Sequence, residues 1–309
     1  MHPSLSGVNE NSALSICSRS FFIVPSSISP DLSNMNRHER KRQLNAELSV
    51  LPTFVPIQDC HIFRVDRTIP VLVLSHLIDL ARITHRYTVD TEKDFYTHQP
   101  ALIQIEFLGT KSIVLVVQVC HLPHPASSLF WMMKALFKAV FSSSNRFYTW
   151  GSVKQELADF IPCGLLSSEL LGRMSDSVDV QKTFKGWYNR TFTHDCPLSS
   201  LKIVDDHPSC TCPHRPMKKQ NQPWSLQRAL ACTFREFLDK THTLSRWARS
   251  LQHGNVRRSD LLRQDRKSFF DQLVLYTIDD CLSVTKLSVV IESNGSKELL
   301  RQYQQQRHQ

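Results

Sequence analysis

The feature that most constrains the fold is a series of three strand-like segments between residues 86 and 120. Segments 101–107 (ALIQIEF) and 112–120 (SIVLVVQVC) are rich in β-branched side chains, and Gly109 lies in the short turn between them. This pattern is typical of a β-hairpin. Segment 86–92 (RYTVDTE) precedes the hairpin and has the same character. We therefore expect a β-sheet built on these segments at the centre of the fold.

Apolar residues at helical spacing surround this predicted sheet. We expect helices at 36–48, 69–82, 125–141, 152–160, 224–240 and 269–287, a basic turn and helix start at 255–267, and short strands at 146–150 and 179–184. Ser152 is the expected N-cap of its helix. Mixed helices and strands in this order predict an α/β fold, with a mixed β-sheet flanked by helices.

Changes in composition divide the chain into regions. Residues 1–58 are rich in Ser and basic side chains and are predicted to be a largely disordered tail, whereas 59–292 carry the folded domain. A segment of Pro, His, Cys and Lys clusters at 188–223 is predicted to be an insertion, and 293–309 a polar C-terminal tail. The basic helix at 36–48 has two interpretations that remain open, a targeting or nucleic-acid patch and a solvated linker.

Charge and cysteine usage narrow the class of protein. The net charge is +9, and residues 211–270 contain thirteen Lys and Arg against four Asp and Glu, as a surface that follows phosphates would need. Apolar runs such as Ile113–Val117 are far shorter than a membrane span, so no membrane partner is expected. Nine cysteines without a framework spacing predict reduced thiols in an intracellular protein, either nuclear or cytoplasmic.

Two acidic residues on the first predicted strand are candidates for chemistry. Side chains alternate between the faces of a strand, so Asp90 and Glu92 point to the same side. Neighbouring carboxylates repel each other unless a cation lies between them, and Mg²⁺ and Mn²⁺ prefer oxygen ligands. The bare Asp-x-Glu pattern also fits two solvated acids at a strand end, and it gains weight only from a second motif.

The second motif lies on the predicted helix at 269–287. Tyr276 and Asp280 are four residues apart and therefore share one face of that helix. Together with Asp90 and Glu92 on a strand, this Tyr-x-x-x-Asp pattern resembles the DEDDy 3′–5′ exonuclease family. The segments 98–107 (HQPALIQIEF) and 238–251 (LDKTHTLSRWARSL) are similar to further parts of that family, in the same order. The resemblance covers roughly residues 70–290 and implies a ribonuclease H-like fold.

The resemblance also implies an activity and a set of site residues. A member of this family would hydrolyse phosphodiester bonds at 3′ ends by a two-metal mechanism with Mg²⁺ or Mn²⁺. Asp90, Glu92 and Asp280 match three of the four metal-binding acids, and Tyr276 matches the tyrosine that would orient the attacking water. Glu156 stands where the family has aspartate, so it either supports the second ion or weakens that site. A catalytically impaired module that binds nucleic acid or protein is therefore the alternative function.

Two further groups of residues suggest binding sites. Trp247 with basic neighbours could stack on and neutralise single-stranded nucleic acid. For Trp247 the other interpretation is packing within the family-like segment. The basic residues are Arg246, Arg249, Arg257 and Arg258. Cysteines and histidines at 194–214 have zinc-ligand chemistry, but their spacing is not that of a typical zinc site, and an ordinary loop is the other interpretation. No motif distinguishes DNA from RNA as the substrate.

Overall fold

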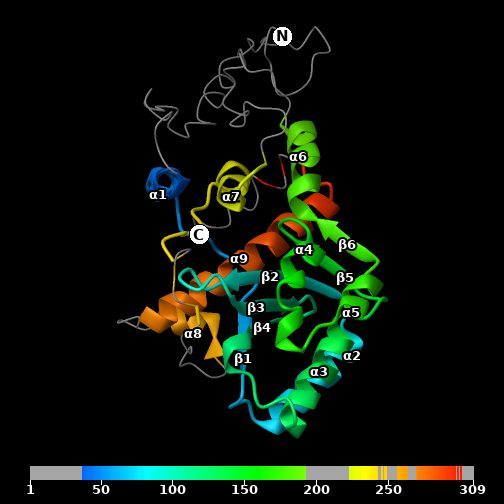
Figure 1. Ribbon diagram of the computed structural model, residues 1–309. Coiled ribbons are helices and arrows are strands. Elements are labelled where there is room, and N and C mark those ends of the chain that lie inside the picture. The colour runs from blue at the N-terminus through cyan, green and yellow to red at the C-terminus, as the bar shows by residue number, and fades with distance from the viewer. Residues whose placement is uncertain are drawn as a thin grey trace, which may run out of the picture. The chain divides into compact units, whose positions relative to one another are not determined.

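The computed structural model of the 309-residue chain describes residues 37–192, 223–242, 245, 247–248, 256–263, 269–296, 298 and 300. Contacts between elements group Asn36–Thr193 and Asn221–Gln309 into one unit. Its centre is a mixed β-sheet with helices on both faces (Figure 1).

Seven described strands form the sheet, in the order β6-β5-β2-β3-β4-β1-β7. The strands are β1 Cys60–Val65, β2 Arg86–Lys93, β3 Pro100–Phe107, β4 Ser112–Gln118, β5 Arg146–Thr149, β6 Asp176–Asp179 and β7 Val256–Arg257. Strands β2, β3 and β4 are antiparallel neighbours, whereas β5 and β6 run parallel to β2, and β1 runs parallel to β4. The short β7 adds an antiparallel edge to β1. This arrangement confirms the predicted α/β class, with a mixed β-sheet flanked by helices.

The α-helices of the described residues are α1 Arg37–Leu48, α2 Val71–Ile83, α3 Ser128–Val140, α4 Val153–Ala158, α5 Ser168–Arg173, α6 Val180–Thr191, α7 Leu226–Phe234, α8 Arg258–Arg263 and α9 Phe269–Glu292. Two short 3₁₀ turns, Val119–His121 and Ile161–Cys163, join neighbouring elements. None of the described helices combines the length and the apolar character that crossing a lipid bilayer requires.

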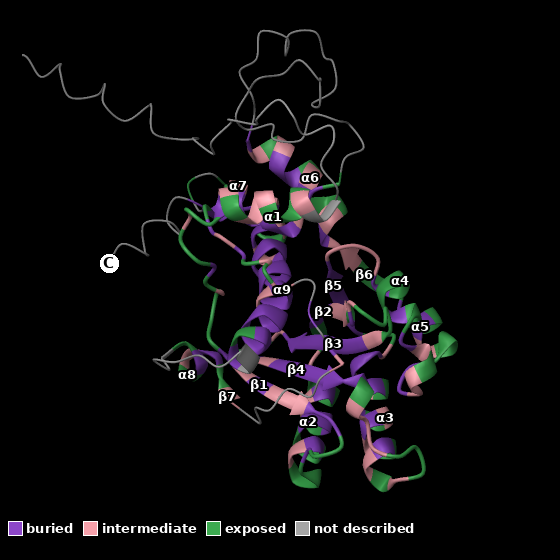
Figure 2. Cartoon of the chain, turned by 60° about the vertical axis from the view of Figure 1, so that its left-hand side comes forward, coloured by how far each residue is buried: buried purple, intermediate pink, exposed green. Residues whose placement is uncertain are grey.

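The two faces of the sheet differ in chemistry because side chains alternate along each strand. On one face, Val89, Ile103 and Ile105 belong to the hydrophobic core that packs against α2 and α3. On the other face, α9 lies across the sheet and contacts β2, β3, β4 and β5 (Figures 1 and 2). Thr88 and Asp90 alternate with Val89 and therefore face α9. The long C-terminal helix thus covers a polar face of the central strands.

The hairpin prediction is confirmed, since β3 and β4 pair in the antiparallel direction from Leu102 with Gln118 to Phe107 with Ile113. Strand β1 is not among the strands expected from the sequence. It alternates buried residues with partly exposed ones in the segment CHIFRV, and His61 and Arg64 interrupt its apolar character. It forms because all six of its residues pair with the already buried β4.

Two predicted elements have different boundaries. The strand expected at 179–184 is wrong: β6 ends at Asp179, whose side chain accepts a hydrogen bond from the backbone N–H of Lys182 and thereby caps α6. The helix expected at 224–240 ends at Phe234, because Arg235 has a left-handed backbone with φ of 57°. Ser152 occupies the N-cap position of α4, although its side chain makes no capping hydrogen bond.

The segment before β1 also differs from the predicted tail of 1–58. Residues 37–48 form α1, and the chain that follows packs on the unit: Phe54 is 2% exposed, and its backbone N–H donates to the carbonyl of Phe237 over 2.8 Å. Strand-type pairing of Thr53 with Phe237 extends this contact. The part of the predicted tail that the structure describes therefore belongs to the folded unit, and the residues before 37 lie outside the described ranges.

Candidate metal centre

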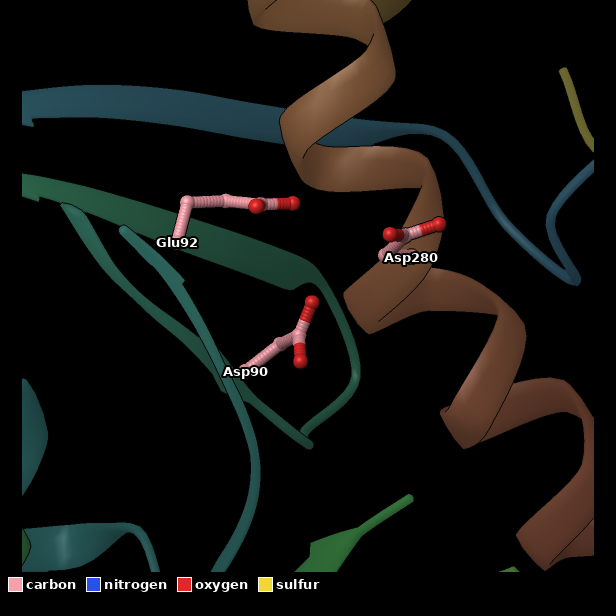
Figure 3. Close-up of side chains that lie close together, drawn as sticks. All are labelled: Asp90, Glu92 and Asp280. Carbon is pink, nitrogen blue, oxygen red and sulfur yellow. The ribbon is translucent and has the colours of Figure 1, made fainter. Parts of the chain in front are cut away.

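Strand β2 and helix α9 bring the two acidic motifs together. Asp90 and Glu92 leave the same face of β2, near its C-terminal end, and Asp280 leaves the turn of α9 that crosses this strand (Figure 3). α9 is fixed on the sheet here by a buried contact, because the Cys281 thiol donates to the carbonyl of Thr88 over 3.4 Å. Residues nearly 200 positions apart in the sequence thus meet at one place.

One carboxylate oxygen from each of the three acids lies within 4.8 Å of the other two. Asp280 is 4% exposed, and its Oδ1 atom has no hydrogen-bond partner among the described residues. A buried carboxylate oxygen without a partner is costly, so it requires a ligand. Three carboxylates that converge in this way match the oxygen ligands that Mg²⁺ and Mn²⁺ prefer, so the residues fit a divalent ion.

The electrostatics of the cluster point the same way. Burial raises the pKa of Asp90 to about 7, and the charge of Asp280 adds to this effect. Burial and the charges of Asp90 and Asp280 raise the pKa of Glu92 well above its ordinary value. Burial also raises the pKa of Asp280. Burial and mutual repulsion disfavour the ionised form of these three acids. A cation bound between them would therefore stabilise them as anions.

One positive charge at the cluster comes from Lys240. Its ammonium group forms an ion pair with Oδ2 of Asp280, which leaves Oδ1 for another ligand. The same ammonium group lies 5.1 Å from the ring centre of Tyr276. Burial alone would lower the pKa of Lys240, but Asp280, Tyr276 and Glu92 together raise it above its ordinary range. Lys240 is therefore a permanent cation at this site.

The tyrosine of the motif lies next to the acids but inside the protein. Tyr276 is 6% exposed, and its ring packs on Trp247 at 5.6 Å and on His242 at 6.0 Å between ring centres. Lys240 contacts both Tyr276 and Asp280, which confirms that the two residues share one face of α9. The tyrosine ring is thus held in one orientation beside the cluster.

Hydrogen bonds hold the segment that supplies Lys240 and Trp247 at both of its ends. Oδ2 of Asp94, just after β2, accepts the backbone N–H of Ala248 over 3.0 Å, and His121 Nε2 donates to the Ala248 carbonyl over 2.9 Å. At the other end, Oδ1 of Asn45 on α1 accepts the backbone N–H of Lys240 over 2.8 Å. These hydrogen bonds fix the backbone at Lys240 and at Ala248, which restricts the directions from which the lysine side chain can approach the acids.

The fourth predicted acid is adjacent to the cluster rather than part of it. Glu156 on α4 accepts a hydrogen bond from the Thr91 hydroxyl over 3.1 Å, and its charge contributes to the raised pKa of Asp90 after burial and Asp280. It does not belong to the group whose oxygens converge. Asp159, three residues after Glu156, forms an ion pair with Lys93. Asp279, next to Asp280 in the sequence, pairs with Arg258 through both oxygens at 2.8 and 3.1 Å.

Two of the five residues predicted to contact nucleic acid are buried. Trp247 is 1% exposed and packs on Tyr276, and Arg258 is 5% exposed and held by Asp279, so neither side chain is available to a strand at the surface. These two assignments are corrected: both residues brace the site from within. Arg257 is exposed. Arg246, Arg249 and the zinc-type cluster at 194–214 lie outside the described residues.

Two polar features of the site are not among the residues expected from the sequence. Lys240 is part of the segment LDKTHTLSRWARSL, and the similarity of this segment to the exonuclease family was the signal that could have identified it. Gln104 pairs across the sheet with Asp90, is fully buried, and neither polar atom of its amide has a partner among the described residues. Its position inside an apolar strand, LIQIEF, was the only indication of a polar function.

Comparisons with known proteins found similar solved structures but no matching family model or curated sequence. Similar solved structures include the Nibbler EXO domain of Aedes aegypti, with 16% identity, a TM-score of 0.42, and coverage of 79% of this chain and 95% of that one. The catalytic core of RRP6 from Trypanosoma brucei, a C496S mutant, has 16% identity and a TM-score of 0.40. That comparison covers 86% of this chain, which spans 59% of the RRP6 chain.

Proposed function

We propose that the protein is a metal-dependent 3′–5′ exonuclease, which removes nucleotides one at a time from the 3′ end of single-stranded nucleic acid. The observation that carries this proposal is the convergence of Asp90, Glu92 and Asp280 within 4.8 Å, with an unpartnered oxygen on Asp280. The net charge of +9 supports a polyanionic substrate. The 3′ polarity and the use of two ions come from the resemblance of the sequence motifs.

In this mechanism the chain's carboxylates hold the metal ions. Asp90, Glu92 and Asp280 would hold the ions, and Glu156 beside them would support this binding. When bound, divalent ions stabilise the charge on the attacking and departing oxygens of an in-line displacement. The new bond forms between water oxygen and phosphorus, the bond to the 3′ oxygen breaks, and that oxygen takes up a proton. The products are a mononucleotide and a strand shortened by one.

Tyr276 is proposed to orient the attacking water. A tyrosine hydroxyl generally acts as a hydrogen-bonding group rather than as a base at neutral pH. The ring of this tyrosine is fixed between Trp247, His242 and the Lys240 ammonium group, so the side chain has little freedom to leave the site. Rigid placement of this kind is what water positioning requires.

The test is the shortening of a 5′-labelled single strand in the presence of Mn²⁺. Wild type is expected to produce a ladder that shortens from the 3′ end, and Asp90→Asn to lose at least about a hundredfold of the rate, because a neutral amide is a poor metal ligand. Asp79→Asn is the matched control, since Asp79 is an exposed acid on α2 that pairs with Arg82. It should leave the rate unchanged. A wild type that binds Mn²⁺ and the strand without shortening it would contradict the proposal.

The alternative function, a binding module without turnover, is favoured by one observation: Glu156 lies outside the converging oxygens. Two bound Mn²⁺ ions per chain in calorimetric titration would support the enzyme. A single ion together with an intact strand would support the binding module.

A further inference from the structure

The cation at the centre of the acid cluster is part of the chain itself. Lys240 forms an ion pair with one oxygen of Asp280, while the other oxygen of Asp280 has no partner among the described residues. Its side chain is 22% exposed, and its charge acts on all three carboxylates, since it opposes the raised pKa values of Asp90, Glu92 and Asp280. Any divalent ion held by these acids would share the site with a fixed ammonium group.

The surroundings hold Lys240 in this place. Asn45 on α1 fixes its backbone through the hydrogen bond of 2.8 Å, and Gln227 on α7 donates to the same Asn45 oxygen over 2.6 Å. Asp239 fixes the turn that follows, by accepting the backbone N–H of Thr241 over 2.9 Å. The ring of Tyr276 supplies a cation–π contact on the inner side. Helices α1, α7 and α9 therefore constrain this one lysine toward the acids.

We propose that Lys240 is a built-in counter-ion of the acid cluster, which holds the carboxylates together without metal and lowers their affinity for divalent ions. This inference rests on the proposed metal centre. It adds that Lys240 sets the affinity of that centre for divalent ions. A fixed unit charge a few ångströms from a divalent ion repels it even where the effective dielectric constant is about 20. Weak binding of this kind makes occupancy depend on the concentration of free metal.

The experiment measures Mn²⁺ affinity by isothermal titration calorimetry, with the full chain and no nucleic acid. Lys240→Gln removes the charge and should lower the Kd for Mn²⁺ by at least about tenfold, because the repulsion disappears while the three acids remain. Lys240→Arg keeps the charge and should stay within about twofold of wild type. This conservative variant separates the effect of charge from a general disturbance of the site.

The matched control is Lys286, a second buried lysine that lies on α9. It forms an ion pair with Glu236 at 2.6 Å and lies over the rings of Phe54 and Phe234, so it has the same kinds of contact as Lys240. Its ion-pair partner, Glu236, is not one of the three acids of the cluster. Lys286→Gln should lower the stability of the fold and leave the Kd for Mn²⁺ unchanged.

The outcomes separate this inference from the proposed function. An unchanged or weaker affinity in Lys240→Gln would overturn the inference, because Lys240 would then only orient Asp280. Wild type that does not shorten a strand, combined with tighter Mn²⁺ binding in Lys240→Gln, would overturn the exonuclease and support the counter-ion. If neither protein binds Mn²⁺, both the metal centre and the inference are wrong.

Discussion

At the scale of single residues, the polar face of the sheet continues beyond the metal centre. Glu106 on β3 is 1% exposed and accepts hydrogen bonds from the hydroxyls of Ser112, at 2.6 Å, and Thr285. Thr285 also shares a hydrogen bond of 2.6 Å with Thr88. Burial raises the pKa of Glu106 from its ordinary 4.5 to about 7, although the two hydroxyls oppose this shift. Glu106 therefore binds a proton more readily in the folded protein than in the unfolded chain.

This pKa predicts the sign of a stability change with pH. Below pH 4.5, Glu106 is protonated in both the folded and the unfolded protein and does not change the free energy of unfolding. As the pH rises to about 7, the unfolded chain loses this proton first, so the free energy of unfolding falls. Glu106→Gln cannot ionise. The difference in free energy of unfolding between wild type and this variant should therefore change by about 2–3 kcal/mol between pH 5 and pH 8, in favour of the variant at pH 8.

Urea denaturation at the two pH values measures this difference. Glu169→Gln serves as the control, because Glu169 is exposed and pairs only with Arg173 among the described residues. Its difference from wild type should not change with pH. An equal pH dependence in wild type and Glu106→Gln would show that Glu106 ionises in the folded protein as it does in water.

At the scale of elements, helix α1 has a charge order that helix stability does not explain. Arg40, Lys41 and Arg42 lie in its first half, and Glu47 lies in its last turn. A helix dipole favours acidic residues at the start and basic residues at the end. Glu39 in the first turn follows this rule, whereas the three basic residues after it and Glu47 near the end do not. Asn45 joins α1 to Lys240, and among the charges that oppose the raised pKa of Glu92 are those of Lys240 and Lys41.

We expect the basic half of α1 to contact the phosphates of a bound strand. Replacing Arg40 and Arg42 by Gln should weaken binding of a single-stranded 20-mer. It should also reduce the salt dependence of log Kd by up to about 1.4, because each phosphate that a basic side chain neutralises contributes about 0.7 to that slope. Fluorescence anisotropy at several salt concentrations, with the Asp90→Asn protein to prevent cleavage, measures both quantities.

The control for α1 lies on the other face of the sheet. Lys134 and Lys138 belong to α3, which packs against the hydrophobic core on the side away from α9. Replacing both by Gln removes the same charge from the whole chain. If this pair weakens binding as much as the α1 pair, the contact is a general effect of net charge and not a property of α1.

At the scale of the whole molecule, the folded unit begins earlier than the sequence suggests. Phe54 lies in the segment predicted as a tail, yet it is buried, and the ammonium group of Lys286 lies 5.5 Å from its ring centre. Phe54→Ala should therefore lower the free energy of unfolding by about 3–5 kcal/mol, as for other buried phenylalanines. Urea denaturation checks this value.

The neighbouring Val55 is the control for that measurement. Its side chain is 49% exposed, and its structural contact with Lys286 is made by its backbone carbonyl, which a substitution to Ala retains. Val55→Ala should change stability by less than about 0.5 kcal/mol. Equal and small effects at both positions would place this segment outside the cooperative unit.

The sequence by itself determined the central hairpin, the α/β class and the placement of the two residues of each motif on one side of their element. These properties are local: alternation along β2 places Asp90 with Glu92, and helical spacing places Tyr276 with Asp280, whatever else the chain does. Strand β1 and the end of α7 were not determined in this way. β1 depends on its pairing with β4. α7 ends where Arg235 adopts a left-handed backbone conformation, and no glycine stands there to signal such an end in the sequence.

Only the tertiary structure decided which charges surround the acids. It placed Lys240 on Asp280, buried Trp247 and Arg258, which were candidates for contact with nucleic acid, and left Glu156 beside the cluster rather than in it. Each of these outcomes depends on contacts between segments far apart in the chain, where burial and opposite charge set the balance. A sequence motif fixes which residues can meet, and the packing of α9 and its neighbours on the sheet fixes how exposed and how charged they are when they do.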